Sequence, residues 1–353
     1  MNLKNTCTNS PVGVIGAGSF GTALANLLAH NARVYLYMRT DEKAQIVQRE
    51  RACSGQKLHK DVIVSSDLSY ITTQCQVLFP VVPSGVFRSV MRTLGFLLKP
   101  HHVLIHGIKG LAISDRVELR GLSRASVVTR DDVQTMSEVI RQQSCVQKIG
   151  CLAGPNLAYE LAQGQPAATV LASRNKSVVK LGQRLLKNPS FQVYQSSDII
   201  GVELCGVLKN IMALASGCLE GARYGANTRA LLINRGLVEM IYLGRAMGGR
   251  TRSFIGLAGM GDLIATCTSR LSRNYQVGCL LGRGQTLKHI LEGRKETIEG
   301  IRTVAIVRGL AQHYRIRLPI TETMYRVLFG RLSVPEAVAR LMRGPFKKDV
   351  DFL

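Results

Sequence analysis

Three glycines in the pattern Gly16-x-Gly18-x-x-Gly21 stand between a short apolar run, residues 12–15, and a run rich in Ala and Leu, residues 22–29. Another apolar run, residues 33–37, follows after a polar turn. In a strand–turn–helix–strand unit, the first glycine permits a tight turn, the second lets the backbone approach a pyrophosphate, and the third lets the helix pack closely on the strand. The order therefore predicts a dinucleotide-binding βαβ unit, with the helix amides facing the phosphates.

The apolar runs that follow are strand-sized until about residue 195 and helix-sized afterwards. Further strands are predicted over residues 76–82, 103–106, 148–153, 168–171 and 191–194, and helices over 198–219, 228–247, 275–282, 300–313, 321–329 and 334–342. Strands alternating with helical segments indicate a mostly parallel sheet. At 353 residues two domains are expected. We predict an α/β fold: a Rossmann-type doubly wound domain over residues 1–195, followed by an all-helical domain over residues 196–353.

The chain is strongly basic, with 46 Lys and Arg against 23 Asp and Glu, a formal charge of +23. Such a charge attracts nucleic acid, an acidic membrane or a phosphorylated small molecule. The positive charge is spread evenly along the chain. Residues 1–195 contain 23 basic and 11 acidic residues, and residues 196–353 contain 23 basic and 12 acidic residues. Because no block of basic residues stands out, an ordinary solvated surface is the favoured interpretation of the charge.

The nine cysteines form no Cys-x-x-Cys pair, and their number is odd. This pattern is typical neither of a disulfide framework nor of a zinc site. We therefore expect no bound metal, and we expect free thiols in a reducing compartment. Apolar stretches such as residues 77–83 are short and interrupted by Pro. We therefore expect no membrane span, no signal peptide and a cytoplasmic location.

Cofactor choice depends on the end of the second predicted strand, where an acid usually binds the ribose hydroxyls of NAD. Arg39 stands there instead, and it suits a 2′-phosphate or stacks on adenine. Asp41 and Glu42 are close enough to favour NAD. The sequence leaves NADPH and NADH open.

Lys209 lies in a predicted helix that is apolar on almost every face. Burial would lower its pKa toward the range of a general acid or base. The alternative is a lysine that extends from the edge of the helix to water.

Other polar residues occur where a ligand would bind. Asp262 lies among glycines and aliphatic residues, either as a buried carboxylate or as a helix N-cap, and Ser272-Arg273-Asn274 would form a phosphate clamp. Lys109 and Gly154 follow predicted strands, at the sheet edge where ligands bind.

Several of these motifs occur together in the order typical of one family. They are Gly16–Ala25, Lys109-Gly110-Leu111, Gly154-Pro155, Gly201–Asn210, Gly259–Leu263, Ser272-Arg273-Asn274, Glu299-Gly300 and Pro319–Glu322. Over nearly its whole length the chain resembles the NAD(P)-dependent glycerol-3-phosphate dehydrogenases of the bacterial type. The resemblance implies a Rossmann domain with a helical substrate domain, and interconversion of dihydroxyacetone phosphate and sn-glycerol 3-phosphate for phospholipid synthesis.

The resemblance also assigns roles to residues. Lys209 would be the catalytic proton donor and acceptor. The substrate contacts would be Lys109, Gly154, Asn156, Lys209, Asn210, Asp262, Thr266, Ser272, Arg273 and Asn274. The cofactor contacts would be Gly16, Gly18, Ser19, Phe20, Gly21, Arg39, Lys109, Ala158, Arg273, Thr297 and Glu299. Two segments depart from the family pattern: Asn156-Leu157 replaces Ser or Thr followed by Phe, and the segment around Thr297 lacks a small aliphatic residue.

Two other functions fit parts of the sequence. One is a β-hydroxyacid-type dehydrogenase of the same two-domain plan, whose substrate carries a carboxylate instead of a phosphate. The other is an inactive Rossmann protein that binds nucleic acid through its +23 charge. We expect a phosphorylated small-molecule substrate and no nucleic-acid partner, and a homodimer stays open.

Overall fold

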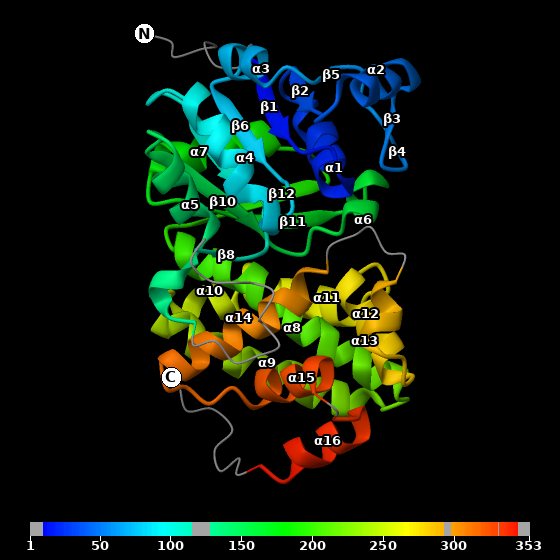
Figure 1. Cartoon of the computed structure of the whole chain (residues 1–353). Helices are drawn as coiled ribbons and strands as arrows, with labels where there is room; N and C mark the ends of the chain where they lie inside the picture. Colours follow the sequence, from blue (N-terminus) through cyan, green and yellow to red (C-terminus); the bar gives the residue numbers. More distant parts are fainter. Residues whose placement is uncertain (1–9, 115–127, 293–297, 331, 345–353) are drawn as a thin grey trace. The chain divides into compact units, whose positions relative to one another are not determined.

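The computed structural model describes residues 10–114, 128–292, 298–330 and 332–344 (Figure 1). The chain forms two compact units. The first comprises residues 1–108 and 136–199, and the second comprises residues 109–135 and 200–353. The predicted single boundary after residue 195 does not describe this grouping, because segment 109–135 belongs to the helical unit. Val128 of that segment packs so closely on Gly309 that a Cβ atom there would lie 2.7 Å from the Val128 Cβ.

The first unit is built on an eight-stranded sheet. Its order is β12 (Phe191–Ser196), β11 (Ala167–Ala172), β10 (Lys148–Ala153), β7 (Val103–His106), β6 (Val77–Pro80), β1 (Val12–Ile15), β2 (Val34–Tyr37) and β5 (Val62–Ser65). Only the β10–β11 pair is antiparallel, so the predicted mostly parallel sheet is confirmed. Two features were not predicted from the sequence: β5, which is a half-buried edge strand, and the small hairpin of β3 (Ala52–Cys53) and β4 (Gln56–Lys57).

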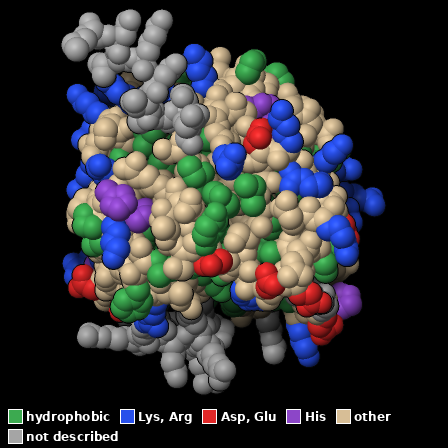
Figure 2. Space-filling view, turned by 90° about the horizontal axis from the view of Figure 1, so that it is seen from above, with side chains coloured by type: hydrophobic (Ala, Val, Ile, Leu, Met, Phe, Trp, Pro, Cys, Tyr) green, Lys and Arg blue, Asp and Glu red, His purple; other side chains and the backbone are tan. Residues whose placement is uncertain are grey.

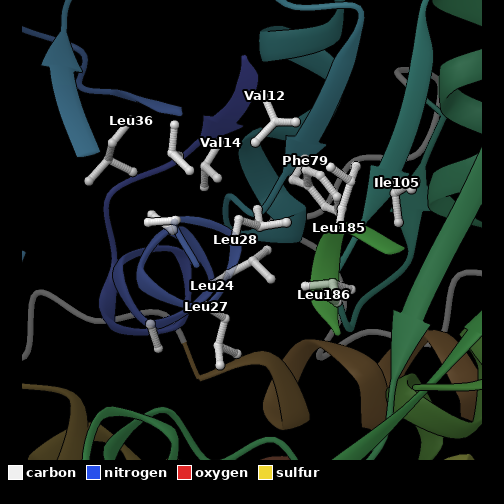
Figure 3. Close-up of a cluster of buried hydrophobic side chains, with 14 of the residues drawn as sticks. Val12, Val14, Leu24, Leu27, Leu28, Leu36, Phe79, Ile105, Leu185 and Leu186 are labelled. Carbon is white, nitrogen blue, oxygen red and sulfur yellow. The ribbon is translucent and has the colours of Figure 1, made fainter. Parts of the chain in front are cut away.

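Helices pack on both faces of this sheet. They are α1 (Ser19–Leu28), α2 (Asp41–Glu50), α3 (Leu68–Gln74), α4 (Ser84–Leu97), α5 (Met136–Gln143), α6 (Ala158–Ala162) and α7 (Lys176–Leu186). Alternate residues of a strand face opposite sides. Val12 and Val14 point toward Leu24 and Leu28 of α1 (Figure 3), whereas Gly13 faces Ile71 of α3. The doubly wound fold is therefore confirmed.

Over its described residues, the second unit is helical apart from one short strand pair. Its helices are α8 (Ile199–Gly221), α9 (Ala226–Ala246), α10 (Thr251–Ile255), α11 (Asp262–Thr268), α12 (Arg273–Gly282), α13 (Leu287–Leu291), α14 (Glu299–His313), α15 (Pro319–Phe329) and α16 (Val334–Met342). A π-helical turn (Leu257–Gly261) precedes α11. The pair β8 (Ala112–Ile113) and β9 (Val133–Gln134) comes from segment 109–135. The predicted helical C-terminal domain is confirmed.

Helix α8 forms the centre of this unit. By length and hydropathy it is the one described helix that could cross a membrane, which the sequence analysis did not anticipate. However, 94% of its apolar window is buried inside the protein. Protein side chains therefore already cover the faces that lipid would have to contact, as in the core helix of a globular domain.

The basic side chains and the cysteines are distributed as the sequence predicts. Figure 2 shows Lys and Arg side chains scattered over the viewed face, not gathered into one block. The eight cysteines of the described segments are free, and all but Cys145 and Cys279 are buried.

Helices α8 and α12 meet through reciprocal glycines. A Cβ atom at Gly217 or Gly221 of α8 would lie 2.1 Å from a backbone oxygen of α12. In return, a Cβ atom at Gly278 or Gly282 of α12 would lie 2.1 or 2.2 Å from a backbone oxygen of α8. The two backbones are in contact, so neither helix tolerates a side chain here. This contact sets the distance between α8, with Lys209, and α12, with Arg273 at its start.

We expect Gly278→Ala to destabilise the protein. The added methyl group would meet Leu214 O at 2.1 Å, and backbone atoms cannot move aside as a flexible side chain does. Overpacking of this kind costs about 1–3 kcal/mol, and rigid backbone contact places the loss at the upper end. Urea denaturation measures it. Gly225→Ala is the control, because nothing lies within 4 Å of its Cβ position; equal stability of wild type and Gly278→Ala would contradict the packing.

Candidate active site

The glycine pattern forms the turn between β1 and α1. Gly16 has φ +127°, a conformation that L side chains rarely adopt, and a Cβ atom at Gly21 would lie 1.8 Å from Gly16 O. Around Gly18, in contrast, nothing lies within 4 Å of the Cβ position. The first and third glycines are therefore required by the fold, whereas the second leaves open space beside the backbone. The turn fits a pyrophosphate at Gly18.

The first turn of α1 is suited to an anion. Its N-cap is Gly18, which supplies no side-chain cap, and no acid lies in the first turn. The amides of the first helical residues therefore face outward with the positive end of the helix dipole. Phe20 packs against the end of β7, where a Cβ atom at Gly107 would lie 2.7 Å from its ring.

The β3–β4 hairpin holds the glycine turn in place, a feature that the sequence analysis missed. Ser54 Oγ donates a hydrogen bond of 3.0 Å to Ala17 O, and Cys53 Sγ lies 3.3 Å from the same oxygen. Gln56 Nε2 donates to Ser19 O at 2.8 Å. Nothing in the polar segment 52–57 signals this role, because it depends on a hairpin that folds back over the turn.

Arg39 lies two residues beyond the end of β2, and its side chain is exposed. The nearby carboxylate of Asp41 is already engaged: Gln45 Nε2 donates to one oxygen at 2.7 Å, and Ser66 Oγ donates to the other at 3.0 Å. Asp41 therefore stabilises the start of α2. The guanidinium of Arg39 is an exposed positive charge at the end of β2, although Glu42 is exposed three residues further on.

The loop after β10 contains Gly154 and Asn156. Gly154 has φ +152° and approaches the Thr169 backbone, with its Cβ position 3.1 Å from Thr169 Cα. Asn156 Nδ2 donates to Thr169 Oγ1 at 2.8 Å, whereas Asn156 Oδ1 is buried with no hydrogen-bond partner. A buried acceptor without a donor is costly unless a ligand supplies one. Ala158 is the first residue of α6.

In the second unit, two lysines share one buried carboxylate. Lys209 Nζ donates to Asp262 Oδ1 at 2.5 Å, and Lys109 Nζ donates to Asp262 Oδ2 at 2.7 Å. Thr266 Oγ1 accepts from Lys209 Nζ at 2.5 Å. The exposed fractions of Lys209 and Asp262 are 5% and 1%. The sequence alternatives of an extended Lys209 and an N-cap Asp262 are therefore wrong: Asp262 is the first residue within α11, and Gly261 is its cap.

Burial and charge shift the pKa values of this cluster. Burial lowers the pKa of Lys209 to about 8, although the attraction of Asp262 partly opposes it. For Asp262, burial alone would raise the pKa, but the ammonium groups of Lys109 and Lys209 outweigh it and hold the pKa below its usual value. Near neutral pH, Asp262 is a carboxylate and Lys209 is an ammonium that gives up its proton readily. A pKa close to the working pH suits a general acid.

Local backbone features position these three groups. The π-helical turn before α11 brings Gly259 against the preceding helix, where a Cβ atom would lie 2.0 Å from Phe254 O. Such turns are frequent at functional sites because they redirect the next residues. On α8, Gly206 leaves space for the stem of Lys109, whose Cγ lies 3.2 Å from the Cβ position.

A chain of side-chain amides connects the surrounding segments. Asn210 Nδ2 donates to Lys109 O at 3.2 Å, Asn274 Nδ2 donates to Asn210 Oδ1 at 3.0 Å, and Gly300 N donates to Asn274 Oδ1 at 3.0 Å. The chain joins the Lys109 loop to α8, α12 and α14. Asn210 and Asn274 therefore act at least as positioning residues. Both the nitrogen and the oxygen of the Asn274 side-chain amide form hydrogen bonds within the protein.

The remaining candidates lie at the starts of two helices. Ser272 is the N-cap of α12, and its Oγ accepts from Tyr275 N at 3.3 Å. Arg273 follows as the first residue of α12 and is exposed. Glu299 is the first residue of α14 and is half-buried. Thr297 lies outside the described residues.

The candidates thus form two sets, one in each unit. The first unit holds Gly16, Gly18, Ser19, Phe20, Gly21, Arg39, Gly154, Asn156 and Ala158, and the second holds Lys109, Lys209, Asn210, Asp262, Thr266, Ser272, Arg273, Asn274 and Glu299. The glycine turn and the buried Lys209–Asp262 pair therefore belong to different units.

Known proteins match the chain over residues of both units. The family model described as the N-terminus of NAD-dependent glycerol-3-phosphate dehydrogenase matches residues 11–179, and the corresponding C-terminus model matches residues 198–339. Glycerol-3-phosphate dehydrogenase (NAD(P)+) of Teredinibacter turnerae is 37% identical over 350 residues, covering 98% of each chain. The enzyme of the same name from Syntrophotalea carbinolica is 38% identical, covering 96% of this chain and 99% of that one.

Solved structures show the same relationship. The crystal structure of glycerol-3-phosphate dehydrogenase from Coxiella burnetii has a TM-score of 0.84 and 33% identity, and covers 95% of this chain and 99% of that chain. A ketopantoate reductase from Ralstonia eutropha, with a TM-score of 0.52 and 14% identity, shares only the fold. Sequence and structure together show that this chain belongs to the NAD-dependent glycerol-3-phosphate dehydrogenase family.

Proposed function

We propose that this protein interconverts dihydroxyacetone phosphate and sn-glycerol 3-phosphate with NADPH or NADH. The observation that carries the proposal is the cluster of Lys209, Asp262 and Lys109, in which a lysine with a pKa of about 8 shares a buried carboxylate with a second lysine. A ketone that accepts a hydride must also accept a proton, and this cluster provides a proton donor near neutral pH. The identity of the substrate is inferred from the family to which the chain belongs.

The first unit fits the cofactor. The open space beside Gly18 and the uncapped first turn of α1 would hold the pyrophosphate, and Ser19 and Phe20 begin that turn. Arg39 would contact the adenosine end. When bound, the nicotinamide donates or accepts the hydride. Lys109, Ala158, Arg273, Thr297 and Glu299 complete the proposed cofactor contacts.

Lys209 would provide the proton to the substrate oxygen. Its ammonium carries three protons, and two of them bond Asp262 and Thr266. The third can pass to the oxygen as the hydride reaches the carbonyl carbon, which leaves a secondary alcohol and a neutral amine. Asp262 remains ionised throughout and holds Lys209 in position. In the oxidative direction, the neutral amine accepts the proton.

Arg273 is the proposed phosphate contact, assisted by the positive charge of Lys109. The Arg273 side chain is exposed at the start of α12. Both ends of the Asn274 amide form hydrogen bonds within the protein. We therefore assign Asn274 a positioning role. In the loop after β10, the unpartnered Oδ1 of Asn156 would accept a hydrogen bond from a substrate hydroxyl.

An absorbance assay tests the reaction. The purified protein should oxidise NADPH or NADH when dihydroxyacetone phosphate is added. Rapid turnover of a phosphate-free hydroxyacid would favour the β-hydroxyacid alternative, and salt-dependent nucleic-acid binding without turnover would favour the inactive Rossmann alternative. Either result, with no turnover of dihydroxyacetone phosphate, would contradict the proposal.

Arg273→Ala should raise KM for dihydroxyacetone phosphate strongly. A charge-assisted bond to a phosphate is worth roughly 1.5–3 kcal/mol, which corresponds to an increase of about ten- to 100-fold. Turnover of unphosphorylated dihydroxyacetone, already slow, should change little. Steady-state kinetics on both substrates measure this. Equal losses for the two would show that Arg273 does not contact the phosphate.

Arg39→Ala should weaken NADPH more than NADH. The Asp41 carboxylate accepts hydrogen bonds from Gln45 and Ser66, and the exposed guanidinium of Arg39 suits a 2′-phosphate. We expect KM for NADPH to rise about tenfold and KM for NADH to change little. Parallel measurements with the two cofactors test this, and an unchanged ratio of the KM values would reject the role of Arg39.

In the cell, we propose that the reductive direction supplies glycerol phosphate for phospholipid synthesis in the cytoplasm. The oligomeric state can be measured directly. Light scattering distinguishes a monomer of 38.6 kDa from the homodimer that the sequence leaves open.

A further inference from the structure

A pocket in the second unit, separate from the residues of the proposed active site, is lined by an unusual number of arginines. Its volume is about 940 Å³, and its lining residues come from α9, α14, α15, α16 and the segments beside them. Figure 1 labels these helices. Six arginines line it: Arg235, Arg308, Arg315, Arg317, Arg340 and Arg343. They come from α9, α14, the loop between α14 and α15, and the end of α16. Segments distant in sequence therefore bring positive charge to one concave site.

The two carboxylates of the pocket do not cancel this charge. Glu322 accepts from Arg308 Nε at 2.7 Å and from Arg326 Nε at 2.8 Å, so it is shared with an arginine outside the pocket. Glu239 is buried and bonds the first turn of α15, accepting from Ile320 N and, at 2.9 Å, from Thr321 Oγ1. Burial raises the pKa of Glu239 to about 7, so near neutral pH its negative charge is only partial.

Four of the arginines are available to a ligand. Arg315, Arg317, Arg340 and Arg343 are exposed, and none of the ion pairs among the described residues includes them. Each guanidinium presents planar N–H groups that match the oxygens of a phosphate. Repulsion among several such groups around one pocket is relieved when a multivalent anion binds.

We propose that this pocket binds a small molecule with two or more clustered phosphate groups, independently of the reaction proposed above. The volume lies within the range of roughly 300–1,000 Å³ typical of small-molecule sites and suits a compact ligand. The arginines surround a concavity and do not form a long stripe, which is the geometry of a small anion and not of a nucleic-acid duplex.

Arg315 permits a test that separates binding from folding. It has φ +54° just after α14, and Ile316 N donates to Ala311 O at 2.9 Å, the hydrogen bond of a Schellman motif. Glycine is the preferred residue at this position. Arg315→Gly should therefore not lower the melting temperature. Any loss of anion affinity in that variant then reports on the missing guanidinium.

The experiment titrates inorganic tripolyphosphate by calorimetry into Arg273→Ala protein with saturating NADPH present. The proposed substrate-phosphate contact is then absent, and the proposed pyrophosphate site beside Gly18 is occupied by the cofactor. We expect one site per chain. Adding Arg315→Gly and Arg317→Ser should weaken binding at least about tenfold, because two charged contacts are lost. Adding Arg174→Ser and Arg184→Ser, two exposed arginines of the first unit, removes the same charge and should leave binding unchanged. Arg340→Ser with Arg343→Ser provides a second pair on the pocket side and should weaken binding similarly.

Absence of a tripolyphosphate site in Arg273→Ala, or equal weakening by the control pair, would overturn the proposal. So would a change of oligomeric state in the Arg315→Gly/Arg317→Ser protein, since the arginines would then belong to an interface between copies. With Arg273 intact, this double variant should keep wild-type turnover of dihydroxyacetone phosphate. Absence of the proposed reaction and absence of anion binding in this pocket are therefore distinguishable results.

Discussion

Lys209→Met is expected to lower kcat for dihydroxyacetone phosphate reduction by at least about 100-fold, in line with the usual contribution of a general acid. Methionine has a similar length and fills the same space in α8, but it has no proton to donate. Asp262 keeps its bond to Lys109 at 2.7 Å, so the carboxylate does not become an isolated buried charge. The fold and the affinity for NADPH should therefore survive, and steady-state kinetics with thermal melting measure both.

The matched control is Lys180→Met, which removes an exposed lysine of α7 in the first unit. It should leave kcat, KM and the melting temperature unchanged. If Lys209→Met retains near-normal turnover, another group donates the proton.

Asp262→Asn should destabilise the protein by about 3–5 kcal/mol, because it removes the common partner of two ammonium groups and leaves Lys209 as a buried, uncompensated charge. Urea denaturation at neutral pH measures this loss. The ordinary pKa of Asp is about 3.9, and the pKa of Asp262 is lower in the folded protein. Its contribution is therefore present above pH 4 and is lost as the pH falls through the folded pKa. The difference between wild type and variant should shrink in acid.

The same substitution should change the pH dependence of catalysis. Asp262 raises the pKa of Lys209 against the effect of burial, so its loss should move that pKa below about 8. The decline of activity at alkaline pH should then begin at lower pH. Thr266→Val is the control, since it removes one hydrogen bond but keeps both charges, and it should cost only about 1 kcal/mol. A larger loss for Thr266→Val than for Asp262→Asn would contradict the electrostatic account.

Features that are formed by residues close together in the sequence could be predicted from it. The glycine turn is set by Gly16 and Gly21, whose contacts lie within one βαβ unit. The sequence placed Lys209 in a helix that is apolar on almost every face and so favoured its burial, which the structure shows. Strand β5 was missed because it is short, half-buried and at the sheet edge, where a continuous apolar run is not required.

Features that depend on packing between distant segments could not be predicted. The sequence identified Lys109, Lys209 and Asp262 separately, but their bonds depend on how α8, α11 and the loop after β7 pack together. The same holds for the grouping of segment 109–135 with the helical unit. The same is true of the reciprocal glycines of α8 and α12 and of the arginines around the pocket. Their roles could not be predicted, because they depend on contacts between helices that are far apart in sequence.

The pH dependence of hydride transfer tests the central claim, that Lys209 donates the proton, most directly. The measurement is the rate of NADPH oxidation by dihydroxyacetone phosphate in a single turnover, so that product release does not obscure the chemistry. Because Lys209 must be protonated and its pKa is about 8, the rate should be constant near pH 6–7 and should fall above about pH 8, approaching tenfold per pH unit. A rate that stays constant to about pH 10, or the same decline in Lys209→Met, would contradict the account.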